Sequence, residues 1–479
     1  MSIHRLQPSV HMNPNRMLPA WGCASLLLLL LMLPAALMAA RFSDDVAVHE
    51  LDNGMRVIVK PDRRAPVVVS MVWYRVGSMD EHNGVTGVAH VLEHMMFKGT
   101  RSVPAGEFSR LIAGAGGRDN AFTSRDYTAY FQILQKSALP LALRLEADRM
   151  RNLVITPEEF AKEIKVVMEE RRWRTDDNPQ AVVHERLMAS ALKAHPYRHP
   201  VIGWMSDLET LTVEDTRRFY EQWYAPNNAV LVVVGDVQPA EVFALAQRHF
   251  GRIPGRPLPE RKAQAEPPQP GIQRLTVKVP AEQAQVLMAW RAPRLQDPAA
   301  DWEPYALDML EAILSGNAAA RLPQALVRDQ RLAISAGAGY EGIGRGPGFF
   351  LLAGTPVPGR SAAELEAALR RELQRVIDEG VSEAELNRVR AQIISADVYQ
   401  RDSMFFQARM IGVLETVGLS FRAQDLFIER LQQVSAEQIR DVARKYLVDD
   451  QLTVAYLDPQ PMAGAPPRAA PPAGVRHGN

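Results

Sequence analysis

Two histidines and a glutamate lie within the pentapeptide HVLEH, residues 90–94. The surrounding segment, residues 84–97, has helical periodicity, and its apolar stripe lies opposite His90, Glu93 and His94. Side chains four positions apart lie one turn apart on one helix face, so both imidazoles can converge on a single ion. Zinc binds neutral imidazole well, and its catalytic sites usually combine three protein ligands with a water. The alternative is a pair of surface histidines, or of histidines satisfied within a core.

A third ligand is expected on the helix that begins after Thr156. Glu163 and Glu170 lie seven residues apart on one face of this helix, with Val166 and Val167 between them. Two carboxylates beside valines are costly to bury unless a metal and a ligating histidine compensate for them. Glu170 is therefore the candidate third ligand, and Glu163 is the candidate carboxylate that orients a histidine. Spacing alone is equally consistent with two solvated helix carboxylates.

Composition limits the remaining chemistry. The chain has 479 residues, of which 47% are hydrophobic and 23% charged, an ordinary globular balance. Its 55 basic and 55 acidic side chains cancel, so no excess charge favours nucleic acid or an anionic membrane as a partner. The single cysteine, Cys23, lies in the N-terminal targeting region. Disulfides are therefore excluded, and a metal site must use His, Asp or Glu.

The N-terminus has the pattern of a secretory signal. Basic residues precede an apolar run, residues 24–33, and small residues follow it up to Ala40. We therefore expect a signal peptide over residues 1–40 and a mature protein that is exported, periplasmic and soluble. An uncleaved membrane anchor is the alternative, although the run is short for a full span. Met12 and Met17 are alternative start sites.

The rest of the chain divides into two similar halves. The helix opening TPEE at 156–159 recurs as SEAE at 382–385, and YAPNN at 224–228 recurs as YLVDD at 446–450, with offsets of 226 and 222 residues. Two nearly constant offsets indicate a duplicated domain of roughly two hundred residues. We expect a first, zinc-binding domain over 41–252, a linker rich in proline and charge over 253–271, a metal-free second domain over 272–458 and a disordered tail over 459–479.

The chain resembles the inverted-motif zinc peptidases of the pitrilysin–insulinase family, also called M16, and is most similar to the short two-domain members such as the mitochondrial processing peptidases. The resemblance spans nearly the whole mature chain and follows the order of the family's motifs. It implies an α+β fold of two homologous domains, each a mostly antiparallel sheet with helices packed on one face. The stretches that carry it are HVLEHMMFKGT, GGRDNAFTSRDYTAYF, EIKVVMEERRWRTDDNP, HPYRHPVIGW, YAPNNAVLVVVGD and RLPQALVRDQRLA.

The resemblance also implies the ligand set. In the family the third ligand is a glutamate about seventy-five residues after the second histidine, and Glu170 lies 76 residues after His94. Glu163 then lies seven residues earlier, as in the family. In the second half, the position 226 residues after Glu170 is Ala396, which cannot bind a metal. We therefore expect one Zn²⁺ per chain, held by His90, His94 and Glu170.

The implied activity is that of a zinc-dependent endopeptidase acting on unfolded peptides or exported polypeptides. Glu93 would be the general base that activates the attacking water. Family members bind substrate as an added strand, which implies a substrate-binding edge near Asn120 and Phe122. The alternative for Asn120 is a structural role in a turn. The alternative function is a non-catalytic assembly subunit that retains the fold.

One segment departs from the family pattern. In family members an arginine and a tyrosine from the second domain complete the active site. Here Arg328 is retained, but Ile334 occupies the tyrosine position and cannot donate a hydrogen bond. Either Tyr340 replaces the missing tyrosine, or a zinc-less paralogue supplies the pair in a heterodimer, which is the arrangement we favour. Arg328 is also consistent with a surface arginine.

Three further clusters are expected to be structural. The prolines of HPYRHP, residues 195–200, indicate a rigid loop. The basic run at 171–174 is expected to be a solvated helix end, paired with Asp176 and Asp177. The glycine-rich segment at 342–348 does not precede a helix in a nucleotide-binding pattern, and predicts a hairpin connection.

Overall fold

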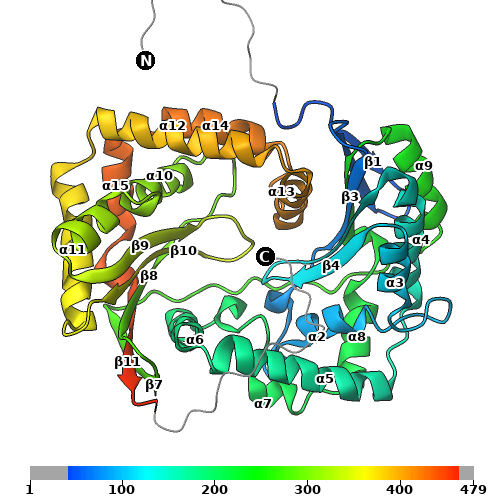
Figure 1. Ribbon diagram of the computed structural model, residues 1–479, viewed down its shortest axis with the longest axis horizontal. Helices are drawn as coiled ribbons and strands as arrows, with labels where there is room; N and C mark the ends of the chain where they lie inside the picture. The colour runs from blue at the N-terminus through cyan, green and yellow to red at the C-terminus, as the bar shows by residue number, and fades with distance from the viewer. Residues whose placement is uncertain (1–40, 463–479) are drawn as a thin grey trace, which may run out of the picture. The chain divides into compact units, whose positions relative to one another are not determined.

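Two mixed β-sheets organise the protein, whose computed structural model describes residues 41–462 (Figure 1). The first sheet has the strand order β1-β2-β6-β3-β5-β4, and the second has the order β7-β11-β8-β10-β9. Residues 45–252 are here called the first lobe, and residues 272–462 the second lobe. The strands are β1 (Ala47–Glu50), β2 (Arg56–Pro61), β3 (Val67–Tyr74), β4 (Arg118–Thr123), β5 (Thr128–Gln135), β6 (Ala229–Gly235), β7 (Gln273–Pro280), β8 (Gln285–Ala292), β9 (Ala333–Glu341), β10 (Gly348–Pro356) and β11 (Leu452–Gln460).

The two sheets share one topology. β2 pairs with β6 in parallel, and β7 pairs with β11 in the same way. The other neighbouring pairs are antiparallel. In chain order, β2 to β6 occupy the same places in the first sheet that β7 to β11 occupy in the second, and β1 adds one edge strand. The predicted α+β fold of two homologous, mostly antiparallel domains is confirmed.

The repeated helix openings mark equivalent helices in the two lobes. Thr156 accepts a hydrogen bond from the Glu159 amide at the start of α5, and Ser382 accepts one from the Glu385 amide at the start of α12. The helices are η1 (Ser78–Asp80), α2 (Val88–Met95), α3 (Glu107–Gly114), η2 (Lys136–Ala138), α4 (Leu139–Asn152), α5 (Pro157–Arg171), η3 (Arg172–Asp176), α6 (Pro179–Ala191), η4 (Pro196–Arg198), α7 (Met205–Leu208), α8 (Val213–Trp223), η5 (Pro226–Asn228), α9 (Pro239–His249), α10 (Glu303–Ser315), η6 (Pro323–Asp329), α11 (Ala362–Glu379), α12 (Glu383–Gln400), α13 (Met404–Val417), α14 (Ala423–Gln433), α15 (Ala436–Tyr446) and η7 (Asp449–Gln451).

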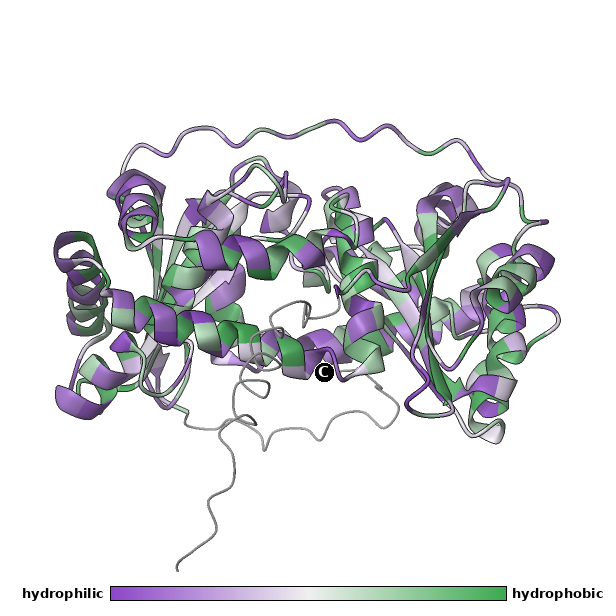
Figure 2. Cartoon of the chain, turned by 90° about the horizontal axis from the view of Figure 1, so that it is seen from above, coloured by the Kyte–Doolittle hydropathy of each residue, from purple (hydrophilic) through white to green (hydrophobic). Residues whose placement is uncertain are grey.

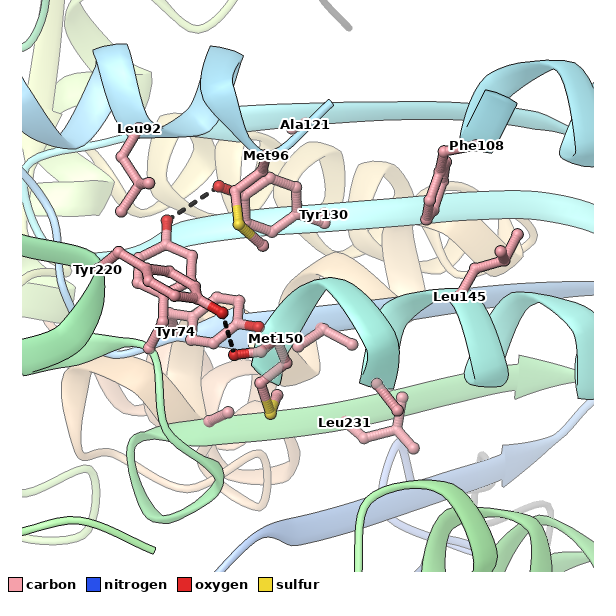
Figure 3. Packing of buried hydrophobic residues seen from close by; sticks show 14 of the residues in the cluster. Tyr74, Leu92, Met96, Phe108, Ala121, Tyr130, Leu145, Met150, Tyr220 and Leu231 are labelled. Carbon is pink, nitrogen blue, oxygen red and sulfur yellow. Dashed lines mark hydrogen bonds between the residues drawn. The ribbon is translucent and has the colours of Figure 1, made fainter. Parts of the chain in front are cut away.

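The core of the first lobe holds α2 against the first sheet. Figure 3 shows Leu92 and Met96, from α2 and its C-terminal end, beside Tyr74 of β3 and Tyr130 of β5. The hydroxyl of Tyr130 shares a hydrogen bond of 2.9 Å with that of Tyr224. A buried tyrosine hydroxyl needs such a partner, while its ring contributes apolar contact area. This packing fixes the helix that carries the HVLEH motif.

Each lobe also contributes one helix to the sheet of the other lobe. α6 packs on β7, β8 and β11 of the second sheet, and α13 packs on β3 and β6 of the first (Figure 1). The contact of α13 is close, because a side chain at Gly412 would overlap the indole of Trp73 in β3. Helices were predicted on one face of each sheet. The exchanged helices cover the second face as well.

Two predicted domain boundaries can be compared with the structure: the linker between the lobes and the end of the second lobe. Residues 253–271 carry neither helix nor strand, and Figure 2 draws them as an extended trace between the lobes. Strand β11 continues through Pro459 and Gln460, so the tail predicted from residue 459 begins too early. The composition of residues 459–479, rich in proline, alanine and glycine, predicted disorder and gave no indication that Pro459 pairs with Val279 of β7. Proline is tolerated there because pairing with β8 has already ended at Leu457.

Two predictions concern parts of the chain outside the described residues. The expected signal peptide, residues 1–40, and most of the expected disordered tail, residues 463–479, are among them. Within residues 41–462, no helix combines the length and the apolar character that crossing a bilayer requires.

Candidate metal centre and active site

Three side chains from α2 and α5 converge at one point. The Nε2 atom of His90 lies 3.7 Å from Oε2 of Glu170, and Nε2 of His94 lies 3.4 Å from the same oxygen. One ligand atom from each residue lies within 4.8 Å of the others. Two imidazole nitrogens and one carboxylate oxygen form a donor set that suits catalytic zinc. The residues present therefore fit a zinc ion, and two helices far apart in sequence bring them together.

The start of α2 is held by a buried carboxylate. Glu81 accepts hydrogen bonds of 2.8 Å from the backbone amides of Gly87 and Ala89, and so satisfies two donors of the first helical turn. Gly87 has a φ of +87°, and a Cβ there would lie 2.6 Å from the carbonyl oxygen of Ile202. Glycine is required at this entry, and the entry sets the rotation of the helix that presents His90.

Glu163, the carboxylate expected to orient a histidine, contacts His94. Its Oε1 lies 2.9 Å from Nδ1 of His94, and Lys98 pairs with its other oxygen. A proton on Nδ1 that is donated to Glu163 leaves Nε2 facing Glu170. Burial lowers the pKa of His94, but hydrogen bonds to Glu163 and Glu170 outweigh burial and raise the pKa to about 9. The anionic surroundings thus favour a cation at this place.

Glu93 lies beside the three candidate ligands and is 3% exposed. Its Oε2 accepts a hydrogen bond of 2.5 Å from the hydroxyl of Thr123, the last residue of β4. Thr123 belongs to the expected substrate-binding edge, in the GGRDNAFTSRDYTAYF stretch, but sequence analysis did not predict its contact with Glu93. No spacing rule links the end of a strand to a residue thirty positions earlier in a helix, so only the fold reveals this contact.

The prediction of a solvated basic run after Glu170 holds for Arg172 and Arg174, which are exposed. Arg171 pairs with Asp176 over 3.4 Å as expected, but Arg171 itself is buried. Arg171 is 4% exposed and donates to both carboxylate oxygens of Glu185 and to the carbonyl of Gly203. Arg174 donates to Oε1 of Glu170 over 2.8 Å. The signal for Arg174 was present in the sequence, because side chains four apart on a helical turn lie on the same face. The segment after α5 continues as the π-helical turn η3, which keeps this pair together.

Strand β4 is an edge of the first sheet, so its outer backbone groups are available to an added strand. Phe122 lines a cavity together with His90 and Glu93, whereas Asn120 is not among the residues that line it. The side-chain oxygen of Asn120 accepts a hydrogen bond from the backbone amide of Ala121. The structure therefore places Phe122 nearer to the metal centre than Asn120.

The candidate residues of the second lobe are not brought to the metal centre. Arg328 is exposed and donates to the carbonyl of Ala318. Ile334, at the expected tyrosine position, is 46% exposed. The hydroxyl of Tyr340 donates to the carbonyl of Pro293 over 2.5 Å, so its proton is already used in a hydrogen bond. Neither Arg328 nor Tyr340 lines the cavity beside the candidate ligands.

The second lobe carries no equivalent centre within the described residues. In α12 the positions equivalent to Glu163 and Glu170 are held by Val389 and Ala396. The one group of metal-binding type found within residues 41–462 is that of His90, His94 and Glu170. One Zn²⁺ per chain stays a prediction.

Comparison with known proteins gives consistent matches over both lobes. The family description "Insulinase (Peptidase family M16)" matches residues 56–203, and "Peptidase M16 inactive domain" matches residues 210–393. A zinc protease of Helicobacter pylori, PqqE, is 31% identical over 460 residues, which cover 94% of this chain and 100% of that protein. An uncharacterised zinc protease of Mycobacterium leprae is 31% identical over 435 residues, covering 88% of this chain and 93% of the relative.

Solved structures show the same fold. A protease from Helicobacter pylori superimposes with a TM-score of 0.82 at 29% identity, covering 86% of this chain and 99% of that one. A putative M16-like peptidase from Alicyclobacillus acidocaldarius gives a TM-score of 0.77 at 22% identity, covering 87% and 98%. The periplasmic protease PqqL of Escherichia coli gives 0.74 at 20% identity, where this chain covers 48% of the longer protein.

Proposed function

The chain belongs to family M16 of the peptidases, and on this basis we propose that it is a zinc-dependent endopeptidase acting on unfolded peptides or exported polypeptides. The observation that carries the proposal is the convergence of His90, His94 and Glu170 beside the buried carboxylate of Glu93. A scaffold protein need not retain a base together with three ligands. This retention weighs against the alternative of a non-catalytic assembly subunit.

The residues of the chain have distinct roles in the proposed reaction. His90, His94 and Glu170 would hold a zinc ion, which would activate water and polarise the carbonyl of the scissile bond. Glu93 accepts a proton from the attacking water and donates it to the leaving amine. Thr123 donates its hydroxyl to one oxygen of Glu93 and so holds the orientation of the carboxylate.

The substrate peptide adds to the free edge of β4, near Asn120 and Phe122. Backbone hydrogen bonds of an added strand recognise an extended peptide without requiring a particular sequence, which suits unfolded substrates. Phe122 then faces the side chains that flank the scissile bond. The proposed location of this activity is the periplasm, which the signal-like pattern of the N-terminus and the name of the Escherichia coli neighbour, a periplasmic protease, support.

The active form is a heterodimer with a zinc-less M16 paralogue. In this chain Arg328 is exposed and Tyr340 is bonded to a backbone carbonyl, so neither completes the site of its own first lobe. A second subunit can supply the missing arginine and tyrosine. Gel filtration and peptide hydrolysis, first with the chain alone and then with the paralogue, test this arrangement. Full activity of the chain alone would contradict it.

Cleavage of an internally quenched peptide tests the proposed function. We expect the chain together with its paralogue to hydrolyse the peptide, and we expect a chelator to abolish this activity and added zinc to restore it. Glu93→Gln should retain zinc and lose turnover, because glutamine cannot accept the proton of the attacking water. Hydrolysis by Glu93→Gln at a rate near that of the unchanged protein would remove Glu93 from the role of base.

A further inference from the structure

A cavity of about 490 Å³ opens beside the candidate metal centre, with His90 and Glu93 in its wall. Three arginines from different parts of the first lobe also line it: Arg125 after β4, Arg174 in η3 and Arg198 in η4. The apolar part of the wall comes from Phe122, Ala181, Met188, Val201 and Ile202. The cavity therefore combines cationic groups with a hydrophobic surface, next to the atoms that would do the chemistry.

Two of these arginines retain donors that can reach a ligand. Arg174 uses one nitrogen to bind Glu170, and its side chain is 49% exposed. Arg198 donates to the backbone carbonyl of Lys193, has no ion pair among residues 41–462, and also lines a neighbouring cavity together with Glu260. A guanidinium has five N–H donors, so neither residue is saturated by the contact it makes.

The carboxylates in the cavity wall are already engaged. Glu185 is bound through both oxygens by the buried Arg171, which approaches from α5. Glu93 accepts the hydroxyl of Thr123. Arg125 forms an ion pair of 2.9 Å with Glu341 of the second lobe. Neither Glu185 nor Glu93, the two carboxylates of this wall, forms an ion pair with Arg198.

His184 and His199 also line the cavity, and they add no charge to its wall. Burial, and then the charge of Arg125, lower the pKa of His184. Burial, and then the charge of Arg198, lower the pKa of His199. Both imidazoles are therefore neutral near pH 7, and they can hydrogen-bond to a ligand without adding charge.

We propose that this cavity is a subsite for a carboxylate of the substrate peptide, contributed by an acidic side chain or by the C-terminus. Arginine binds carboxylates through short, charge-assisted hydrogen bonds, and Arg198 and Arg174 provide the donors. The apolar wall covers the aliphatic part of a glutamate side chain. The proposal rests on the proposed peptidase function, because it places the carboxylate within a substrate bound beside Glu93.

Matched quenched peptides test the subsite. One series carries Glu, Gln or Lys at successive positions around the cleaved bond, each with an amidated C-terminus. A second series carries Gln throughout and compares a free C-terminal acid with its amide. We expect the preferred carboxylate to raise kcat/KM about threefold to tenfold over its neutral counterpart, as for a partly exposed ion pair. This preference should weaken as salt is added. The series that shows it identifies the source of the carboxylate.

Variants assign the preference to the cavity. Arg198→Gln should abolish it, whereas Arg198→Lys, which keeps the charge, should retain part of it. The control is Arg218→Gln, because Arg218 is exposed on α8 and pairs with Asp215 outside the cavity. Equal kcat/KM for Glu and Gln at every position, together with equal values for acid and amide, would overturn the proposal. A preference that Arg198→Gln leaves unchanged would overturn it too.

Peptide binding separates this proposal from the peptidase function. Fluorescence anisotropy of labelled peptides with Glu93→Gln measures Kd without requiring turnover. A carboxylate preference in Kd, with no hydrolysis of any peptide by the unchanged protein either alone or together with the paralogue, would reject the peptidase function and support the subsite. Normal hydrolysis without any preference would reject the subsite alone.

Discussion

Thr123 donates its hydroxyl to Oε2 of Glu93 over 2.5 Å, which ties the edge strand β4 to the candidate base. The hairpin that carries Thr123 is itself held firmly. Thr128 in β5 donates to the carbonyl of Val76, and a side chain at Gly77 would overlap the backbone of Ser124. The strand that offers its edge to substrate therefore also fixes the orientation of the base. Such supported positioning is what efficient proton transfer requires.

Thr123→Val should lower kcat about tenfold and leave KM and zinc content nearly unchanged. Valine keeps the shape of the side chain but removes the donor, so the carboxylate of Glu93 loses its fixed orientation. Thr123→Ser should restore most of the rate because serine retains the hydroxyl. Steady-state kinetics with a quenched peptide measure both effects. A valine variant within twofold of the unchanged enzyme would show that this hydrogen bond does not position the base.

Glu163→Gln should weaken zinc binding by about tenfold to a hundredfold, because the amide is a poorer acceptor for Nδ1 of His94. Competition with a chelator of known affinity measures the change. Glu158→Gln, at an exposed position of the same helix, is the matched control and should bind zinc normally. Equal zinc affinities for the two variants would contradict the role of Glu163.

Arg174→Gln should also weaken zinc binding, through a different contact. Its guanidinium holds Oε1 of Glu170, so its removal lets the ligating carboxylate rotate. The control is Arg172→Gln, because Arg172 pairs with the exposed Glu169 rather than with a ligand. If both variants hold zinc equally well, the Arg174–Glu170 pair has no part in metal binding.

Gly412→Ala should destabilise the protein by about 1 to 3 kcal/mol, because the added methyl group overlaps the indole of Trp73. The change weakens the packing of α13 on the first sheet and so probes the helix exchanged between the lobes. Denaturant unfolding measures it. Gly359→Ala is the control for space, since nothing lies near a Cβ at that turn, although its φ of +87° carries a separate strain. An unchanged midpoint for Gly412→Ala would show that α13 is not closely packed.

The sequence predicted the elements of the centre that follow local rules. Helical spacing placed His90 and His94 on one face, and the position of Glu170 followed from the resemblance to the family. The repeated helix openings predicted two lobes of common topology. The missed features depend on contacts between distant segments. Thr123 meets Glu93 through the pairing of β4 with β5, and Arg171 is buried because α6 brings Glu185 to it.

The metal content of two neighbouring variants tests the central claim most directly. Glu170→Gln changes a candidate ligand, whereas Glu169→Gln changes the next residue of α5, whose side chain is exposed and paired with Arg172. After purification with zinc and removal of loosely bound metal, elemental analysis should find one zinc ion per chain in the unchanged protein and in Glu169→Gln, and far less in Glu170→Gln. No stoichiometric zinc in the unchanged protein, or equal zinc in both variants, would contradict the metal centre described here.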